Sequence, residues 1–196
     1  MGDSPITIER TTKETSINLS LDFSVRKDPT FDFNLPFFAH ILHAMAFHGE
    51  FSLQIRGGGD LEVDFHHFVE DVGLVFGEAL KKTVDEYGPV QRFGHAVIPM
   101  DDALSEVTID VSGRPFIRFE SEFPQSHAGT FDMSLIREFL AALANRANIA
   151  LHAHCRYGLN SHHMAESLFK AIGKALAQAY SPVSQGAGPK STKGLL

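Results

Sequence analysis

The chain contains the same short pattern of potential metal ligands twice. His66-His67-Phe68-Val69-Glu70 returns 96 positions later as His162-His163-Met164-Ala165-Glu166. The match extends beyond the ligands, because Gly77, Ala79 and Leu80 correspond to Gly173, Ala175 and Leu176 at the same offset. Upstream, with a slip of two residues, the segment 40–53 matches the segment 138–151. An internal duplication is therefore predicted, with a metal site built from both copies.

Composition limits the class of protein. A chain of 196 residues with 43% hydrophobic content can bury one large domain or two closely packed halves. The formal net charge of −7 argues against nucleic-acid or membrane-surface binding, which needs a basic footprint. The single cysteine, Cys155, excludes an intramolecular disulfide and fits a reducing compartment. Without a signal-peptide pattern or a membrane-spanning apolar stretch, a cytoplasmic protein is predicted.

Hydrophobic periodicity predicts strands, a helix, a strand and a helix in each half. In the first half, residues 1–90, strands are expected at 6–10, 17–23, 51–56 and 61–64, with a turn at 57–60. Helices are expected at 36–48, where Gly49 would act as the C-cap, and at 66–84. In the second half, residues 91–180, strands are expected at 107–111, 116–119 and 149–156, and helices at 133–147 and 161–180. The predicted fold class is α+β, with two sheets and four main helices packed between or against them.

Helix geometry indicates where the repeated ligands point. Residues four apart share one face, whereas adjacent residues diverge by about 100°. His66 with Glu70, and His162 with Glu166, can each face one metal ion. His67 and His163 must then point elsewhere, so two metals are predicted, each with ligands from different helices.

His40 and Glu138 are equivalent under the repeat and are natural additional ligands. The full set holds five imidazoles, three carboxylates and no sulfur, which suits Mn, Fe, Co or Zn, and octahedral Mn(II) where carboxylates share the site. An isolated histidine on a helix usually has a structural role. That interpretation is preferred for the histidines without matched partners, which are His43, His95, His127, His152 and His154.

Several segments, in order along nearly the whole chain, resemble the imidazoleglycerol-phosphate dehydratase family of histidine biosynthesis. They are Arg10-Thr11-Thr12-Lys13-Glu14-Thr15, residues 40–49, residues 64–73, Gln91-Arg92-Phe93-Gly94, Pro99-Met100-Asp101, Ser112-Gly113-Arg114-Pro115, residues 160–171 and Ser191-Thr192-Lys193-Gly194. The resemblance implies a duplicated α+β fold whose helices are sandwiched between sheets. It also implies a homo-oligomer of twenty-four subunits with two Mn(II) ions in each active site, between subunits.

The reaction implied by this resemblance is loss of water from imidazole glycerol phosphate, giving imidazole acetol phosphate. Metal ions on the imidazole nitrogens would act as Lewis acids and stabilise an imidazolate-like intermediate. Glu14 matches the family's acid/base position and is also expected to contact substrate. His48 matches a position near the substrate, and Glu166 is assigned to the catalytic group as well as to the metal ligands.

The phosphate group of such a substrate needs cations and hydrogen-bond donors. Five residues match the family's phosphate-binding positions: Arg92, Arg114, Lys170, Ser191 and Lys193. Arginine suits bidentate phosphate contacts, and lysine acts as a point charge. The last two residues lie in the tail, 181–196, whose Gly, Pro and Ser content is typical of disorder. Both statements hold if the tail orders on substrate binding.

The chain also departs from the family pattern. Family members commonly carry Asp where this chain has Ala39, Gln where it has Ala44, and polar residues at Phe65 and Phe68. Glu138 stands where other members have His. All eight expected metal ligands and the cationic residues are present, so an active enzyme with altered surroundings of its ligands is expected.

Three other interpretations remain open. A di-metal phosphatase would place the phosphate beside the metals. A ferritin-like bundle would need helices alone and Glu-x-x-His order, which the predicted strands disfavour. A metal-binding shell protein without turnover is the non-catalytic alternative, disfavoured by Glu14 and Lys193 but consistent with Ala39 and Ala44.

Overall fold

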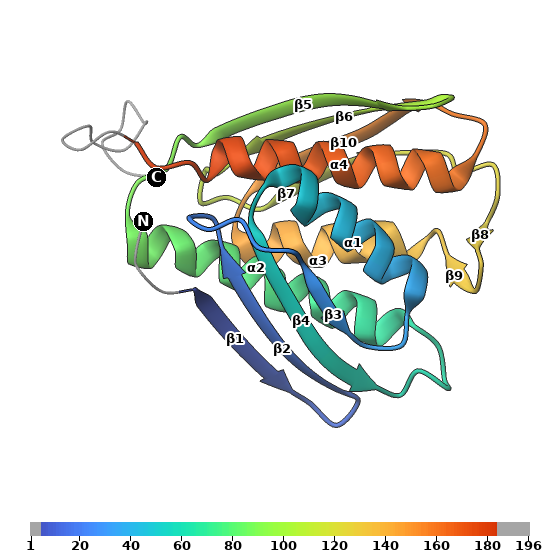
Figure 1. Ribbon diagram of the computed structural model, residues 1–196, viewed down its shortest axis with the longest axis horizontal. Helices are drawn as coiled ribbons and strands as arrows, with labels where there is room; N and C mark the ends of the chain where they lie inside the picture. The colour runs from blue at the N-terminus through green and yellow to red at the C-terminus, as the bar shows by residue number, and fades with distance from the viewer. Residues whose placement is uncertain (1–4, 184–196) are drawn as a thin grey trace.

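Four helices lie between two four-stranded sheets in the computed structural model, which describes residues 5–183 (Figure 1). The first sheet has the order β1-β2-β4-β3, formed by Ile6–Thr11, Thr15–Asp22, Ser52–Gly59 and Thr30–Asp32. The second has the order β5-β6-β10-β7, formed by Phe93–Met100, Ala103–Asp110, Ala150–Tyr157 and Phe116–Glu120. Two short strands, β8 (His127–Ala128) and β9 (Phe131–Asp132), form a separate hairpin. The predicted fold class is confirmed.

Strand pairing is the same in the two sheets. The first three strands of each sheet pair antiparallel, and the fourth pairs parallel with the third. Leu53 of β4 pairs with Leu21 of β2, and its repeat equivalent Leu151 of β10 pairs with Ile109 of β6. β2 and β6 are therefore related by an offset of 88 residues. This offset differs from those of the helices, because the loops of the two halves differ in length.

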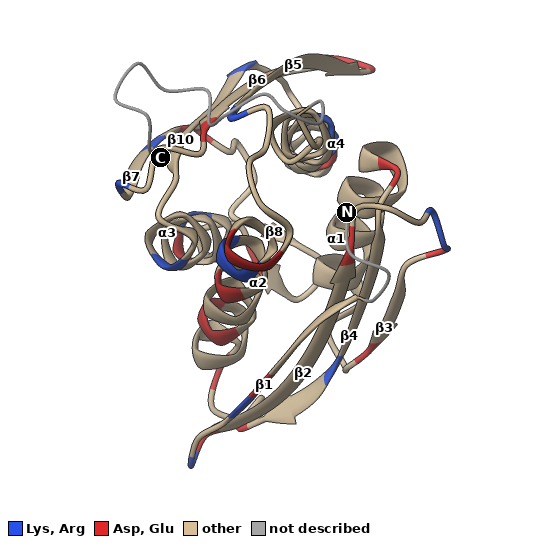
Figure 2. Ribbon diagram, turned by 90° about the vertical axis from the view of Figure 1, so that its left-hand side faces the viewer, with Lys and Arg blue, Asp and Glu red and all other residues tan. Residues whose placement is uncertain are grey.

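The four helices form two pairs, and each pair takes one helix from each half. α1 (Pro36–Gly49) packs against α4 (Ser161–Ala179), and α2 (His66–Tyr87) packs against α3 (Leu135–Ala147), as Figure 2 shows nearly end-on. Their inner faces bury large apolar side chains, including Phe38, Phe68, Phe139 and Phe169. None of the helices within residues 5–183 is long and apolar enough to cross a membrane.

Equivalent glycines set the close approach of both helix pairs. A Cβ atom on Gly77 would lie 2.6 Å from the carbonyl oxygen of Leu143, and one on Gly173 would lie 2.0 Å from that of Met45. Gly77 and Gly173 are repeat equivalents, as are Met45 and Leu143. The two helix pairs therefore cross at equivalent positions, and any side chain at either glycine would separate them.

Two glycine assignments made from sequence were wrong. β4 continues through Gly57, Gly58 and Gly59, which pair with β2, and residues 61–64 form a turn instead of a returning strand. A Cβ on Gly57 would lie 2.6 Å from the Ser16 carbonyl oxygen, so glycine here permits close strand approach. Gly49 is the last residue of α1, and Glu50, with φ of 60°, is the C-cap. Gly49 is instead required by packing, since its Cβ would lie 2.7 Å from the Gly173 carbonyl oxygen.

Candidate metal centre

His40 on α1 and His162 and Glu166 on α4 come together at the start of the two helices. The Nε2 atom of His40 lies 3.2 Å from Glu166 Oε2, and that of His162 lies 3.4 Å from the same oxygen. Single donor atoms of the three residues all lie within 4.8 Å of one another, and no other such group of three occurs in residues 5–183. Asn160 caps α4 by accepting a hydrogen bond from the His162 backbone N–H at 2.9 Å. Two imidazoles and a carboxylate at this spacing fit a divalent transition metal.

Lys170 lies one helical turn beyond Glu166 and keeps its carboxylate charged. Its Nζ atom lies 2.7 Å from Glu166 Oε1 and donates to Met100 Sδ at 3.3 Å. Burial alone would raise the pKa of Glu166, but hydrogen bonds from Lys170 and His40 outweigh that effect and lower the pKa. Glu166 is thus anionic over a wide pH range.

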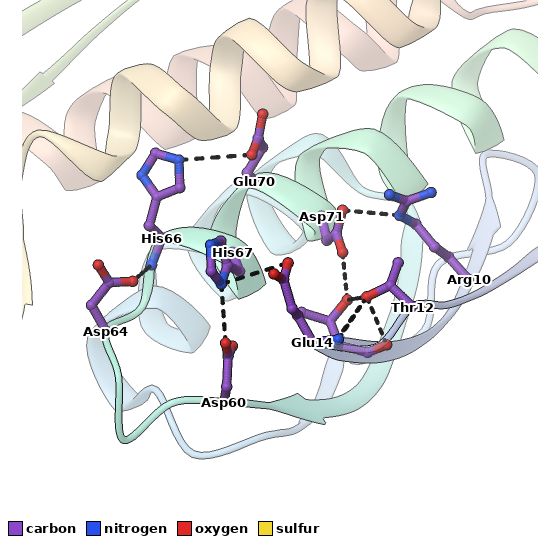
Figure 3. Close-up of polar contacts among 10 residues, drawn as sticks. Arg10, Thr12, Glu14, Asp60, Asp64, His66, His67, Glu70 and Asp71 are labelled. Carbon is purple, nitrogen blue, oxygen red and sulfur yellow. Dashed lines mark hydrogen bonds and ion pairs between the residues drawn. The ribbon is translucent and has the colours of Figure 1, made fainter.

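The first-half motif lies on α2 in a looser arrangement. His66 Nε2 lies 3.7 Å from Glu70 Oε2, as Figure 3 shows. Glu138, on α3, pairs with its neighbour Arg137 at 3.3 Å. These three residues do not bring their donor atoms as close together as the α1/α4 group does.

In each half, the second histidine of the adjacent pair contacts a carboxylate that is not one of the predicted metal ligands. His67 Nδ1–H donates to Asp60 at 3.1 Å, and His163 Nδ1–H donates to Asp102 at 2.5 Å. These hydrogen bonds raise the pKa of both imidazoles. Asp102 also accepts from the backbone N–H of Asn160 at 3.0 Å. The hydrogen bond from His163, followed by those from the backbone N–H groups of Leu159 and Asn160, lowers the pKa of Asp102 well below its usual range. A carboxylate on Nδ1 fixes the ring and makes Nε2 the ligating atom.

Glu14 lies in the β1–β2 turn, beside His67. Its Oε2 atom is 3.7 Å from His67 Nδ1, and the turn is closed by hydrogen bonds from the backbone N–H groups of Glu14 and Thr15 to Thr12 Oγ1 (Figure 3). The buried Asp71 of α2 accepts from Arg10 Nε at 2.9 Å and from the Thr15 hydroxyl. The turn that carries Glu14 is therefore tied to the helix that carries His67.

The strand register reveals a further equivalence. An offset of 88 residues places Glu14 on Asp102, and each of these acids contacts the second histidine of its own half. Sequence reasoning missed Asp60 and Asp102. The histidine motifs recur at an offset of 96 residues, whereas Glu14 and Asp102 are related by the strand offset of 88. The repeat therefore indicates Asp102 only once the strand pairing is known.

A cleft of about 730 Å³ opens beside the α1/α4 group. Its walls include Phe37, His40, His162 and the β8–β9 hairpin with His127. The Phe37 ring lies 5.2 Å from that of His162 and 6.2 Å from that of His40, so it packs against both potential ligands. Phe37 was not predicted as a site residue, because an aromatic residue in an apolar run is usually part of the core.

The expected phosphate-binding residues fall into separate groups. Arg92 precedes β5 and forms a bidentate pair with Asp110, with Nε at 2.7 Å, which raises the pKa of the guanidinium. The loop that contains Arg114 contacts Arg92, because the backbone N–H of Val111 donates to the Arg92 carbonyl oxygen. Lys170 contacts Met100 at the opposite end of β5, roughly 23 Å along the strand. Ser191 and Lys193 lie outside the described residues.

His48 lies in the last turn of α1, close to two lysines. Its pKa is lowered by burial first, then by the charges of Lys170 and Lys174, with Glu166 acting in the opposite direction. The imidazole therefore stays neutral to a lower pH than an ordinary histidine and can both donate and accept hydrogen bonds near pH 7.

Replacing Lys170 with glutamine should raise the pKa of His48, because one neighbouring positive charge is removed. The pKa should remain below 6.5, since burial is the largest cause of the shift and is unchanged. NMR titration of histidine-labelled protein, with His48→Gln to assign the signal, would measure it. Lys81→Gln, an exposed change on α2, is the control, and an unchanged His48 pKa in the Lys170 variant would contradict this assignment.

The departures from the family pattern have different surroundings. Phe68 is fully buried and packs on Phe33 with ring centroids 5.2 Å apart, so it faces the core. Phe65 is partly buried against the same core, and Ala44 is also buried. The two phenylalanines therefore add apolar packing behind the histidine pair.

Comparison with known proteins gives a consistent family. Residues 33–176 match the family model described as imidazoleglycerol-phosphate dehydratase. A protein of that name from Gluconobacter oxydans is 46% identical over 191 residues, covering 96% of each chain, and one from Geobacillus thermodenitrificans is 44% identical over 97% of each.

Two crystal structures of such dehydratases have the same fold. The Staphylococcus aureus enzyme matches with a TM-score of 0.83 at 32% identity, covering 91% of this chain and 99% of its own. The Pyrococcus furiosus enzyme matches with a TM-score of 0.83 at 35% identity, covering 96% and 100%. The resemblance inferred from the sequence motifs is confirmed: the chain belongs to the imidazoleglycerol-phosphate dehydratase family of hydro-lyases.

Proposed function

We propose that this chain converts imidazole glycerol phosphate to imidazole acetol phosphate in histidine biosynthesis, in the cytoplasm, with two Mn(II) ions per active site. The observation that carries the proposal is the group of His40, His162 and Glu166, whose donor atoms lie within 4.8 Å of one another beside an open cleft. Nitrogen and oxygen donors without sulfur suit Mn(II), and they also accept other divalent transition metals.

The remaining ligands complete the proposed metal-binding set. They are His66, Glu70 and Glu138 in the α2/α3 region, together with His67 and His163, whose rings are held through Nδ1 by Asp60 and Asp102. Bound divalent cations would supply Lewis acidity towards the substrate's imidazole ring.

Glu14 is the proposed proton-transfer residue. Loss of water breaks a C–H bond and the C–O bond of the neighbouring hydroxyl group, and one proton must reach the departing oxygen. A carboxylate can accept the carbon's proton and deliver a proton to the hydroxyl, which leaves as water, and the enol that remains tautomerises to the ketone. The clamp of Asp71 on Arg10 and Thr15 supports this role, because it fixes the turn that presents Glu14. Glu166, held anionic by Lys170, and neutral His48 would orient the substrate.

The phosphate group would be bound by Arg92, Arg114 and Lys170, with Ser191 and Lys193 of the tail. Arg92 and Lys170 are placed at opposite ends of β5, too far apart for one phosphate ion within a single chain. His67 and His163 likewise lie outside the close group of donor atoms in their own chain, with Nδ1 bound to Asp60 and Asp102. Both observations support an active site completed by neighbouring copies, in a homo-oligomer of twenty-four subunits.

The test is a direct assay of the purified protein with imidazole glycerol phosphate and Mn(II). Product one water lighter than substrate should form, as measured by mass spectrometry, and removal of metal by a chelator should stop it until Mn(II) is restored. Release of inorganic phosphate instead would indicate a di-metal phosphatase. Metal binding with neither product would indicate a shell protein without turnover.

A further inference from the structure

We infer that the two metal positions of this protein are chemically different, and that the position containing Glu138 prefers harder, more oxygen-seeking cations than the one containing His40. This inference rests on the proposed metal-dependent function. It arises from a break in the symmetry of the duplicated fold, where one half has His40 and the other has Glu138.

The helix pairs place Glu138 and His40 at equivalent points. Gly77 of α2 contacts Leu143 of α3 in the same way that Gly173 of α4 contacts Met45 of α1. Since Leu143 and Met45 are 98 residues apart, the same register carries His40 onto Glu138. His40 lies 3.2 Å from Glu166, and the same register places Glu138 on the side of α3 that corresponds to Glu70 of α2.

The two donor sets therefore differ by one ligand. The α1/α4 set has two imidazoles and one carboxylate: His40, His162 and Glu166. The α2/α3 set has one imidazole and two carboxylates: His66, Glu70 and Glu138. This difference holds for any sharing of ligands between neighbouring chains. Glu138 gives its metal a carboxylate at the place where His40 gives the other metal an imidazole.

Fixed charges increase this difference. Lys170 neutralises Glu166 at 2.7 Å, whereas the equivalent position on α2 is Leu74. The cation that Glu138 contacts is Arg137, an exposed neighbour at 3.3 Å, so its contribution is screened by solvent. Within residues 5–183, neither Glu70 nor Glu138 contacts a buried lysine or arginine. A metal ion would supply the missing positive charge.

Ligand chemistry turns this asymmetry into metal selectivity. Imidazole favours Zn(II) and other ions late in the Irving–Williams order, whereas carboxylate favours Mn(II) and Mg(II). The Zn(II)-over-Mn(II) preference should thus be smaller at the position containing Glu138. A difference of about tenfold or more is expected, the scale on which even the outer partners of metal ligands act.

The experiment is a competition on the assembled protein loaded with Mn(II). Zn(II) is added stepwise, and the released Mn(II) is measured by electron paramagnetic resonance. We expect two phases with midpoints about tenfold or more apart. Anomalous diffraction at the Mn and Zn edges, from crystals with one Zn(II) per chain, should show Zn(II) at the His40 position and Mn(II) at the Glu138 position.

Two matched variants test the cause. Glu138→His should make both positions rich in imidazole, and His40→Glu should make both rich in carboxylate. In each variant the two midpoints should move closer together, and in the His40 variant they should lie at higher Zn(II). A single phase in the unaltered protein, or a separation between the two midpoints that is unchanged in both variants, would overturn the inference while leaving the dehydratase proposal intact. Failure to bind Mn(II) at all would overturn both.

Discussion

Replacing His163 with alanine should remove metal, activity and assembly together. Asp102 holds its ring through Nδ1 at 2.5 Å, and its donor atoms lie outside the close group of His40, His162 and Glu166 in the same chain. In the proposed shared site the ring ligates a metal that another copy also binds, so its loss should disconnect the copies. Activity should fall by at least about 100-fold, because even the outer partners of metal ligands contribute 10- to 100-fold.

Three measurements on this variant separate its effects. Native mass should show smaller species, elemental analysis should show less metal per chain, and the dehydratase assay should show the lost turnover. His154→Ala is the matched control, since His154 is an exposed histidine on β10 that contacts Glu120 outside the donor groups. His67→Ala should behave like the His163 variant. Intact, fully metallated assemblies in both variants would refute a site shared between chains.

Replacing Glu14 with glutamine should lower kcat by about 10²- to 10⁴-fold, the usual contribution of a positioned acid or base. Glutamine keeps the size and hydrogen-bonding capacity of the side chain but cannot transfer a proton. The clamp of Asp71 on Arg10 and Thr15 does not involve the Glu14 carboxylate, so the turn should keep its shape. Metal content and assembly should therefore be unchanged.

Steady-state kinetics, together with metal analysis of the same sample, would measure this effect. Glu9→Gln offers a matched control, because Glu9 is an exposed glutamate on the adjoining strand β1 that accepts from Asn18 Nδ2 at 2.7 Å. A Glu14→Gln enzyme with near-normal kcat would assign proton transfer to another group. A variant that instead lost its metal would make Glu14 a supporting residue of the metal site.

The duplicated architecture could be predicted from the sequence, because half-buried helices and strands have characteristic spacings of apolar residues. It failed where small residues do the packing. β5 was not predicted, because its buried positions include Gly94 and Ala96, which have little apolar bulk and a weak preference for strands. A Cβ on Gly94 would lie 1.9 Å from the Ala175 carbonyl oxygen, so the packing of α4 against β5 leaves no room for a side chain there. The short strand β3 lacked enough residues to show a period.

The donor residues of α4 were accessible from sequence because residues four apart on a helix share a face. Their carboxylate partners were not. Asp60 and Asp102 lie in connections whose lengths differ between the halves, so no constant spacing relates them to the histidines. Likewise, no sequence pattern indicates that Lys170 of α4 contacts one end of β5 while Arg92 precedes the other end.

The crossed pairing of the helices bears on how such a chain could have arisen. Each helix of one half covers its apolar side with a helix of the other, so an ancestral polypeptide of half this length would have had no inner partner of its own. Two copies related by a two-fold axis would have provided one. The present molecule thus has the form of a fused homodimer, in which fusion allowed the once identical positions of His40 and Glu138 to diverge.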